Sequence, residues 1–236
     1  GTDSGNIFTN LAELKVMLSR YGLSNIPIWA TEIGWSTYSR KEGDTSAFAG
    51  KTDLEQAQYF IRFNLRNSKE KFLDKIIWYN YRDGEKPTAR EDNFGLTETN
   101  HYIENTNAAK PSYSALCAYN AIMEGSIFEE ELPKQASKFV YRYTSKRGNP
   151  LYAAWSTLES ASYTLTLPQG IAILYDMFGN SQIISYGGNY TISLSKSPVY
   201  IEVFDSYIST SHNEDGSVKV TGYTPDDINS EGSRMF

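Results

Sequence analysis

The stretch IPIWATEIGWST, from Ile26 to Thr37, is an apolar run that contains a single acid, Glu32. A run this apolar is typical of a β-strand that is buried on both faces, as in a parallel sheet. An unpaired carboxylate in such a place is costly, because removing a charge from water is unfavourable. The stretch therefore raises the question of why a glutamate lies at the end of this strand.

Around this stretch, the first half of the chain alternates helical and strand patterns. Helical spacing of apolar residues predicts helices over NIFTNLAELKVMLSRYG, TDLEQAQYFIRFNLRNS and PSYSALCAYNAIMEG. The second helix opens with Thr52 or Asp53 as N-cap and Glu55 close behind, which is typical of a capping box. A second buried strand, KIIWYNYRD, separates the last two helices. The order helix, strand, helix, strand, helix predicts two βα units and a parallel sheet.

Beyond the acidic segment EEELPKQ, the pattern changes to short strands without helices between them. The alternating segments are separated by Gly, Pro, Asn or Ser turns: KFVYRYTS, LYAAWSTLE, SYTLTLP, IAILYDMFGN, SQIISYGGNYTISLS and PVYIEVF. This spacing predicts an antiparallel β-sandwich. The expected fold class is therefore α/β plus all-β. We assign residues 1–131 to the α/β part, 132–206 to the sandwich and 207–236 to a polar linker or the start of a further module.

The predicted α/β part is small. Two parallel strands do not form an α/β sheet of normal size, which has about five or six strands. Either these strands join others, or this part is the end of something larger. A chain that begins inside a helix–strand alternation favours the second interpretation.

Composition limits the classes of partner and ligand. The net charge of -6 argues against a protein that follows nucleic-acid phosphates, since such proteins carry a basic stripe. No stretch of about 18 apolar residues is present, so no membrane span is expected. His101 and His212 have no partner at ligand spacing, so we expect no metal and no cofactor. The 18 tyrosines either belong to a β-sheet surface or line a site for sugars, peptides or bases.

Strict alternation along the first strand places Ile28, Ala30 and Glu32 on one face, with Glu32 nearest the C-terminal end. In a (β/α)8 barrel, that end is the rim at which catalysis occurs. Trp35 follows in a position to lie against a ligand, and the second strand adds the aromatic and polar residues WYNYRD. Sugar sites combine aromatic platforms, polar groups and carboxylates, because the oxocarbenium-like transition state needs nearby negative charge. The structural alternative is a glutamate paired with an arginine of a neighbouring strand.

Four segments together, PIWATEIGWST, KIIWYNYRD, DNFGL and KPSYSALCAYN, resemble the last two βα units of retaining glycoside hydrolases of clan A, a superfamily of (β/α)8 TIM barrels. In that group, a TE-G segment ends the seventh strand and carries the nucleophile, and the eighth strand brings an aromatic to the floor of the site. The resemblance implies that Glu32 is the nucleophile and Trp78 the sugar platform, with Tyr79 and Tyr81 at the rim. Together with Trp35, these three aromatic residues are the candidate substrate-binding residues.

The resemblance extends into the second half, where LYDMFGN and YTISLSKSPVYIEV are similar to a β-sandwich that packs against the barrel in several of these families. It implies a carbohydrate substrate and a secreted or cell-surface bacterial protein. It also implies that the missing N-terminal part of the barrel is the intramolecular partner of this chain.

A retaining mechanism needs two carboxyl groups about 5 Å apart, of which one attacks and one protonates the leaving oxygen. Family members carry the second in an NE pair on the fourth strand, whereas the only Asn-Glu here, Asn213–Glu214, lies in the polar tail. Asp83 ends the strand next to Glu32, but alternation places it on the face opposite to Trp78. Its expected role is pairing with Arg82 or Arg90, or capping the following loop. The isolated chain is therefore expected to be inactive on glycosides.

Two other functions remain open from the sequence. The first is a non-catalytic extracellular module that binds carbohydrate or mediates adhesion, with a degenerate barrel-like half. The missing acid/base and the tyrosine-rich β-region favour it. The second is a purely structural fragment of a larger assembly or of a proteolysed chain.

Overall fold

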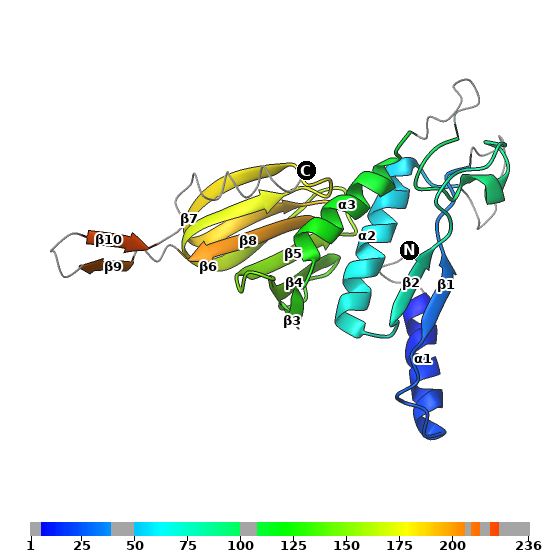
Figure 1. Ribbon diagram of the computed structural model, residues 1–236, viewed down its shortest axis with the longest axis horizontal. Helices are drawn as coiled ribbons and strands as arrows, with labels where there is room; N and C mark the ends of the chain where they lie inside the picture. The colour runs from blue at the N-terminus through cyan, green and yellow to red at the C-terminus, as the bar shows by residue number, and fades with distance from the viewer. Residues whose placement is uncertain (1–5, 39–49, 100–107, 206–208, 213–217, 222–236) are drawn as a thin grey trace. The chain divides into compact units, whose positions relative to one another are not determined.

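The computed structural model describes residues 6–38, 50–99, 108–205, 209–212 and 218–221 (Figure 1). The chain divides into two compact units, Gly1–Ala118 and Tyr119–Phe236, and each is described by itself. The first unit contains, in order, α1 (Asn6–Arg20), β1 (Trp29–Ile33), α2 (Asp53–Glu70), β2 (Lys75–Trp78), the short 3-10 helix η1 (Arg90–Asn93) and the start of α3 (Pro111–Met123). The second contains β3 (Ile127–Glu131), β4 (Lys138–Thr144), β5 (Pro150–Ser156), β6 (Ala161–Tyr175), β7 (Ser181–Leu194), β8 (Val199–Asp205), β9 (Ser209–His212) and β10 (Val218–Thr221).

The two predicted strands of the first unit are parallel neighbours, as expected. Trp29 pairs with Lys75, and Ile33 pairs with Trp78. One face of this pair packs against α1 and α2 through a cluster centred on buried aromatic and aliphatic side chains: Phe8, Phe63 and Leu73, with Leu11, Ile28, Ala30, Ile33, Trp35, Phe72 and Ile76 around them. The helices thus cover one face of the sheet.

The predicted start of α2 is also confirmed. The Thr52 side chain accepts a hydrogen bond from the Glu55 backbone N–H at 3.1 Å, and the Glu55 carboxylate accepts one from the Thr52 N–H at 2.9 Å. This capping box satisfies two of the backbone donors that the first turn leaves without a helical partner. The local sequence is therefore enough to fix where α2 begins.

The alternation expected along β1 is wrong. Its pairing with β2 slips between Ala30 and Ile33, and both of these residues, together with Ile28, pack on the helix side. Thr31 and Glu32 are both exposed between them. Because the slip places one extra residue in the strand, Glu32 does not share a face with Ile28 and Ala30.

The expectation that β1 is buried on both faces is likewise wrong for the described chain. Trp29 is 56% exposed and Ile77 of β2 is 48% exposed. A strand of this composition normally lies in a parallel sheet covered on both sides. Within the part of the chain that the structure describes, the helices cover only the opposite face.

In the second unit, the main sheet has six antiparallel strands in the order β3-β4-β5-β8-β6-β7. The segments SYTLTLP and IAILY, expected as separate strands, form one long β6 with a register slip between Leu167 and Gly170. Only Gly170–Tyr175 of β6 pairs with β8, whereas both of its halves pair with β7. The expected two sheets of a sandwich are thus joined into one hydrogen-bonded sheet among the described strands.

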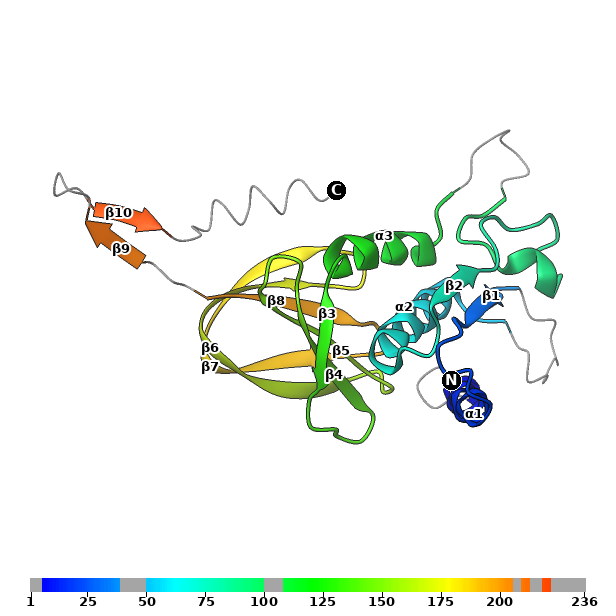
Figure 2. The same cartoon turned by 60° about the horizontal axis from the view of Figure 1, so that its bottom comes forward.

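This sheet curves around a common apolar interior (Figure 2). Both halves of β6 contribute to it, with Leu165 and Ala172 as examples. Trp155 is fully buried and stacks on Phe139 with ring centroids 5.0 Å apart. Buried tyrosines also belong to this unit: Tyr141, Tyr143, Tyr152, Tyr163, Tyr175 and Tyr200. Burial raises the pKa of Tyr200 well above its ordinary value, so this phenol stays neutral.

The sheet begins earlier in the chain than the expected boundary at residue 132. Ile127 of β3 pairs with Thr144 of β4, and the two compact units divide within α3. The sequence hid β3 because it is an edge strand that carries three consecutive glutamates, and charge on an edge discourages pairing with other chains. Farther on, β9 and β10 pair antiparallel. Among the described residues, no helix has the length and apolar character that crossing a bilayer would require.

Candidate functional site

The carboxylate of Glu32 lies at the C-terminal end of β1, exposed on the side of the sheet that the helices leave open. The slip in β1 puts it there, one residue before Ile33 pairs with Trp78. Within the described residues, no arginine pairs with it, so the structural alternative has no support there. A solvated carboxylate at the end of a parallel strand is accessible to a ligand.

Gly34 allows the ends of β1 and β2 to approach closely. A Cβ at this position would lie 2.2 Å from the Tyr79 carbonyl oxygen and 3.0 Å from the Phe94 ring. The Tyr79 N–H donates to the Ile33 carbonyl at 2.9 Å, which continues the pairing past the end of β2. The glycine of the TEIGW motif therefore holds Tyr79 beside the segment that carries Glu32.

The two tryptophans expected to bind substrate point to the helix side instead. Trp35 stacks on Tyr59 of α2 with ring centroids 5.8 Å apart, and its carbonyl accepts a hydrogen bond from Gln56 Nε2 at 2.7 Å. Trp78 lies 4.2 Å from the Phe60 ring centroid and donates through Nε1 to a backbone carbonyl at 3.0 Å. The structure does not bring either ring together with Glu32. The alternation of β2 explains this, since Trp78 shares the half-buried face with Ile76.

The two candidate tyrosines lie just beyond β2, on the segment that follows the strand. The Tyr79 ring meets the Phe94 ring edge-on, with centroids 5.5 Å apart, and leaves Tyr79 half-buried. The Tyr81 side chain is 61% exposed, and its backbone carbonyl accepts hydrogen bonds from the N–H groups of Leu96 and Thr97, both at 3.0 Å. The loop after β2 therefore fixes the backbone of Tyr81 and leaves its ring free.

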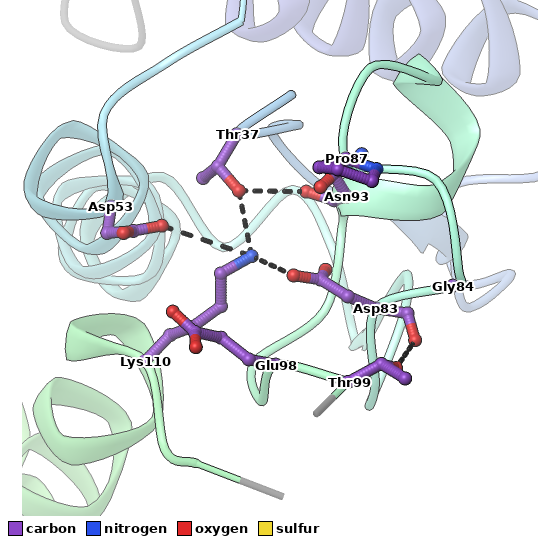
Figure 3. A pocket seen from close by; sticks show the side chains of 9 residues that line it. All are labelled: Thr37, Asp53, Asp83, Gly84, Pro87, Asn93, Glu98, Thr99 and Lys110. Atoms are coloured by element: carbon purple, nitrogen blue, oxygen red, sulfur yellow. Dashed lines mark hydrogen bonds and ion pairs between the residues drawn. The ribbon is translucent and has the colours of Figure 1, made fainter. Parts of the chain in front are cut away.

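Asp83 forms a buried ion pair that the sequence did not predict (Figure 3). Its Oδ2 accepts a hydrogen bond from Lys110 Nζ at 2.7 Å, and its Oδ1 accepts one from the Gly95 N–H at 2.7 Å. The Asp83 side chain is 10% exposed and that of Lys110 only 2%. The prediction that Asp83 caps the following loop is confirmed, whereas its expected partner, Arg82 or Arg90, is wrong because Lys110 occupies that place.

Lys110 also joins the segments that follow the two strands. Its Nζ donates to Thr37 Oγ1 at 2.8 Å, so the amine bridges the loop after β1 and the loop after β2. Asp53 Oδ1, at the start of α2, lies 4.0 Å away (Figure 3). A cavity of about 240 Å³ opens beside the amine and is lined by Thr37, Asp53, Asp83, Gly84, Pro87, Asn93, Glu98, Thr99 and Lys110.

The role of Lys110 was not predicted from the sequence, although the residue belongs to the segment KPSY, which carries part of the family resemblance. A lysine before a helix is normally solvated, and nothing local indicates a buried one. One feature of the sequence could have indicated it: Lys110 directly precedes Pro111, the first residue of α3, at the point where the chain passes the ends of the two strands. Lys110 is bonded to Thr37 and Asp83 and lies near Asp53, so these side chains form a latch that joins the two loops.

Among known proteins, the chain resembles solved structures only. No protein-family model and no curated protein matches the chain. A family 39 glycoside hydrolase from Bacteroides cellulosilyticus WH2 is similar at 25% identity and a TM-score of 0.64, over 82% of this chain and 37% of that structure. The catalytic domain of a family 30 xylanase C from Talaromyces cellulolyticus is 14% identical with a TM-score of 0.51, over 80% and 48% of the two chains.

A third solved structure, the family 51 arabinofuranosidase from Xanthomonas axonopodis pv. citri, is 11% identical with a TM-score of 0.50, over 83% of this chain and 46% of its own. These neighbours are TIM-barrel glycoside hydrolases of clan A, and the chain spans less than half the length of each. The likeness supports a glycosidase-like fold of the α/β plus β class.

Proposed function

We propose that this chain is the C-terminal part of a retaining glycoside hydrolase, made of the last two βα units of a TIM barrel and an accessory β-domain. The observation that carries the proposal is the exposed carboxylate of Glu32 at the C-terminal end of a parallel strand. In barrel enzymes, catalytic side chains project from that end of the strands. The likeness to a family 39 glycoside hydrolase supports the same reaction class.

In this mechanism, Glu32 attacks the anomeric carbon of a carbohydrate substrate and forms a glycosyl–enzyme bond. An acid outside this chain protonates the leaving oxygen, then takes a proton from the water that hydrolyses the intermediate. Tyr79 and Tyr81 bind the sugar beside Glu32. Trp35 and Trp78 do not contact the sugar in this mechanism. They pack on α2 and thereby hold the ends of β1 and β2 in position.

The acid/base comes from elsewhere because Asp83, the candidate on the segment after β2, is already hydrogen-bonded. Asp83 accepts two hydrogen bonds at 2.7 Å, from Lys110 and from the Gly95 N–H. Both of its carboxylate oxygens are thus engaged within the loop, whereas an acid catalyst must reach the leaving oxygen of the substrate. The isolated chain is therefore expected not to hydrolyse glycosides.

The test uses the whole protein expressed from its gene, with a panel of aryl glycosides. The 2-deoxy-2-fluoro derivative of the best substrate should form a stable adduct on Glu32, which peptide mass spectrometry locates. Glu32→Gln should lower kcat by about 10³-fold or more. Glu91→Gln, at an exposed carboxylate of η1, is the matched control and should leave kcat unchanged.

An adduct on another carboxylate, or inversion at the anomeric carbon in the NMR time course, would contradict the assignment of Glu32. Turnover by the isolated chain that disappears in Glu32→Gln would contradict its expected inactivity, and would require a second carboxylate within this chain. A whole protein that leaves every glycoside of the panel intact while binding none would count against the glycosidase proposal itself.

The fold weakens the adhesion alternative, which relied in part on the tyrosine-rich β-region. Several tyrosines of the β-region are buried and therefore not accessible to a ligand, among them Tyr141, Tyr163 and Tyr200. We therefore put forward no second function. Secretion or cell-surface location stays a prediction from the resemblance.

A further inference from the structure

Asn80 lies just beyond β2, between Tyr79 and Tyr81 of the candidate site. The Tyr79 N–H donates to the Ile33 carbonyl at 2.9 Å, which continues the pairing of β2 with β1. Ile33 directly follows Glu32 in the chain. Since paired strands lie about 4.8 Å apart, Asn80 is close to the segment that carries the proposed nucleophile.

The main chain of Asn80 is fixed at both of its hydrogen-bonding groups. Its N–H donates to the Phe94 carbonyl at 3.2 Å, and its carbonyl accepts from the Leu96 N–H at 3.2 Å. Trp78 Nε1 donates to the same Phe94 carbonyl at 3.0 Å. The segment around Phe94 therefore holds the Asn80 backbone, and the side chain can adjust only by rotation about its own bonds.

The side-chain oxygen of Asn80 is buried and has no hydrogen-bond partner. Among the described residues of the first unit, no other buried side-chain oxygen lacks a partner. By contrast, Asn67 donates to and accepts from the Leu73 backbone, both at 3.0 Å, and Asn93 donates to two backbone carbonyls. An acceptor that is removed from water without a partner costs free energy of folding. Asn80 is thus an unfavourable residue for the fold alone.

The amide nitrogen of Asn80 is open. Nδ2 makes no hydrogen bond within the described residues, and it is not enclosed as the oxygen is. The residue as a whole is half-buried, so the carboxamide turns its oxygen inward and its nitrogen outward. An amide NH₂ group carries two donors, and a hydroxyl oxygen accepts such bonds. The outward group of Asn80 therefore has the chemistry of a sugar contact.

We infer that Asn80 determines specificity: its Nδ2 donates a hydrogen bond to one hydroxyl group of the sugar ring bound at Glu32. This rests on the proposed function, which supplies a sugar at that place. Asn80 lies between the two tyrosines assigned to the sugar, so a donor there is within reach of the same ligand. A site that pairs with a substrate hydroxyl rejects the analogue that lacks it, because the polar group of the site is then left unpaired. Residues that cost stability and serve the ligand are common in functional sites.

The test measures kcat/KM of the whole protein on its best aryl glycoside and on the monodeoxy analogues of that sugar. Asn80→Leu keeps a similar side-chain volume and removes both polar atoms. It should lower kcat/KM on the parent glycoside by about 10-fold or more, and on one deoxy analogue by less than about two-fold. The hydroxyl missing from that analogue is the one that Asn80 contacts, because either change removes the same hydrogen bond.

A second measurement separates a sugar contact from a structural role. Asn80→Leu should not lower the melting temperature, because it removes the unpaired buried oxygen. Asn64→Leu is the matched control: Asn64 is also half-buried, but its Nδ2 donates to the Phe60 carbonyl within α2 at 2.9 Å. The control should leave kcat/KM unchanged on every glycoside. Asn80→Ala repeats the measurement with a smaller side chain, so that a poorly fitting leucine does not decide the result.

The inference is overturned if both Asn80 variants keep the wild-type kcat/KM within about two-fold on all the glycosides. It is also overturned if they lose the same factor on the parent and on every deoxy analogue. Asn80 would then act through the fold and not through a contact with the sugar.

Failure of this inference and failure of the proposed function give different results. Glycosidase activity that depends on Glu32 but shows no coupling between Asn80 and a hydroxyl removes the inference and keeps the function. If the wild-type protein hydrolyses none of the glycosides, the proposed function fails before any variant is measured, and the inference falls with it.

Discussion

Two of the sheets formed by the described strands, the six-stranded sheet and the β1–β2 pair, place their tryptophans in different environments. In the six-stranded sheet, Trp155 is fully buried and its ring contacts those of Phe139 and Tyr141. In the β1–β2 pair, Trp29 is 56% exposed, although its sequence is as apolar as that of a buried strand. The comparison shows that the six-stranded sheet buries the large apolar side chains of its sequence. The β1–β2 pair also carries side chains suited to burial, but no described layer covers them.

The largest expected effect follows from this contrast. Trp155→Ala should lower the free energy of unfolding of the second unit by about 4 kcal/mol, because it removes a buried ring and leaves a cavity. Trp29→Ala should change stability by no more than about 0.5 kcal/mol, since the side chain is mostly solvated. Urea unfolding followed by circular dichroism measures both.

Comparable losses for the two tryptophan variants would break the contrast between the sheets. A large loss for Trp29→Ala alone would mean that this ring is already covered in solution by a second copy of the chain. Repeating the measurement at several protein concentrations distinguishes that case.

A smaller effect is expected at the latch between the two loops of the first unit. Lys110→Met should destabilise that unit by about 3 kcal/mol, because Asp83 then remains nearly buried without its cation. Lys146→Met is the matched control: its pair with Glu124 is 3.1 Å long but mostly solvated, so its loss should cost no more than about 1 kcal/mol.

The double variant Lys110→Met, Asp83→Leu sharpens this prediction. Removing both charges should recover part of the loss, since an apolar pair leaves no unpaired ion. If the double variant is no more stable than Lys110→Met, the hydrogen bond that the Gly95 N–H donates to Asp83 contributes more to stability than the ion pair.

The smallest of these effects concerns the glycine of the TEIGW motif. Gly34→Ala should cost about 2 kcal/mol, because its methyl group would lie 2.2 Å from the Tyr79 carbonyl oxygen and the strand ends must separate. Thr31→Ala, at an exposed position of the same strand, should have little effect. Chemical denaturation of the two variants compares them, and equal losses would show that the close approach carries no strain.

Much of the secondary structure was predictable because its causes are local. The capping box of Thr52 and Glu55 and the helical repeat behind it lie within a few residues of one another. The same holds for β4 and β5, whose predicted segments match the observed strands closely. Charge concealed β3, since three glutamates on an edge strand look like a linker.

The candidate site was only partly predictable. The sequence placed Glu32 at the end of a strand, as the structure does. It placed Tyr79 and Tyr81 within the second strand, whereas β2 ends at Trp78 and both tyrosines lie on the segment that follows. It also put Trp35 and Trp78 with them, where the structure packs both rings toward α2. Side-chain direction was the weak step, because a single slip in register reverses every face that follows it.

By itself, the sequence determined the order of helices and strands in the first unit, the parallel pair and the carboxylate in the TEIG segment, because periodicity and caps act over a few residues. Only the tertiary structure decided that β1 slips and turns Glu32 to the open face, and that Lys110 reaches Asp83 across 27 residues of chain. Both depend on contacts between segments far apart in sequence. For the same reason, the glutamate that looked misplaced in a buried strand is in fact exposed at the strand's end.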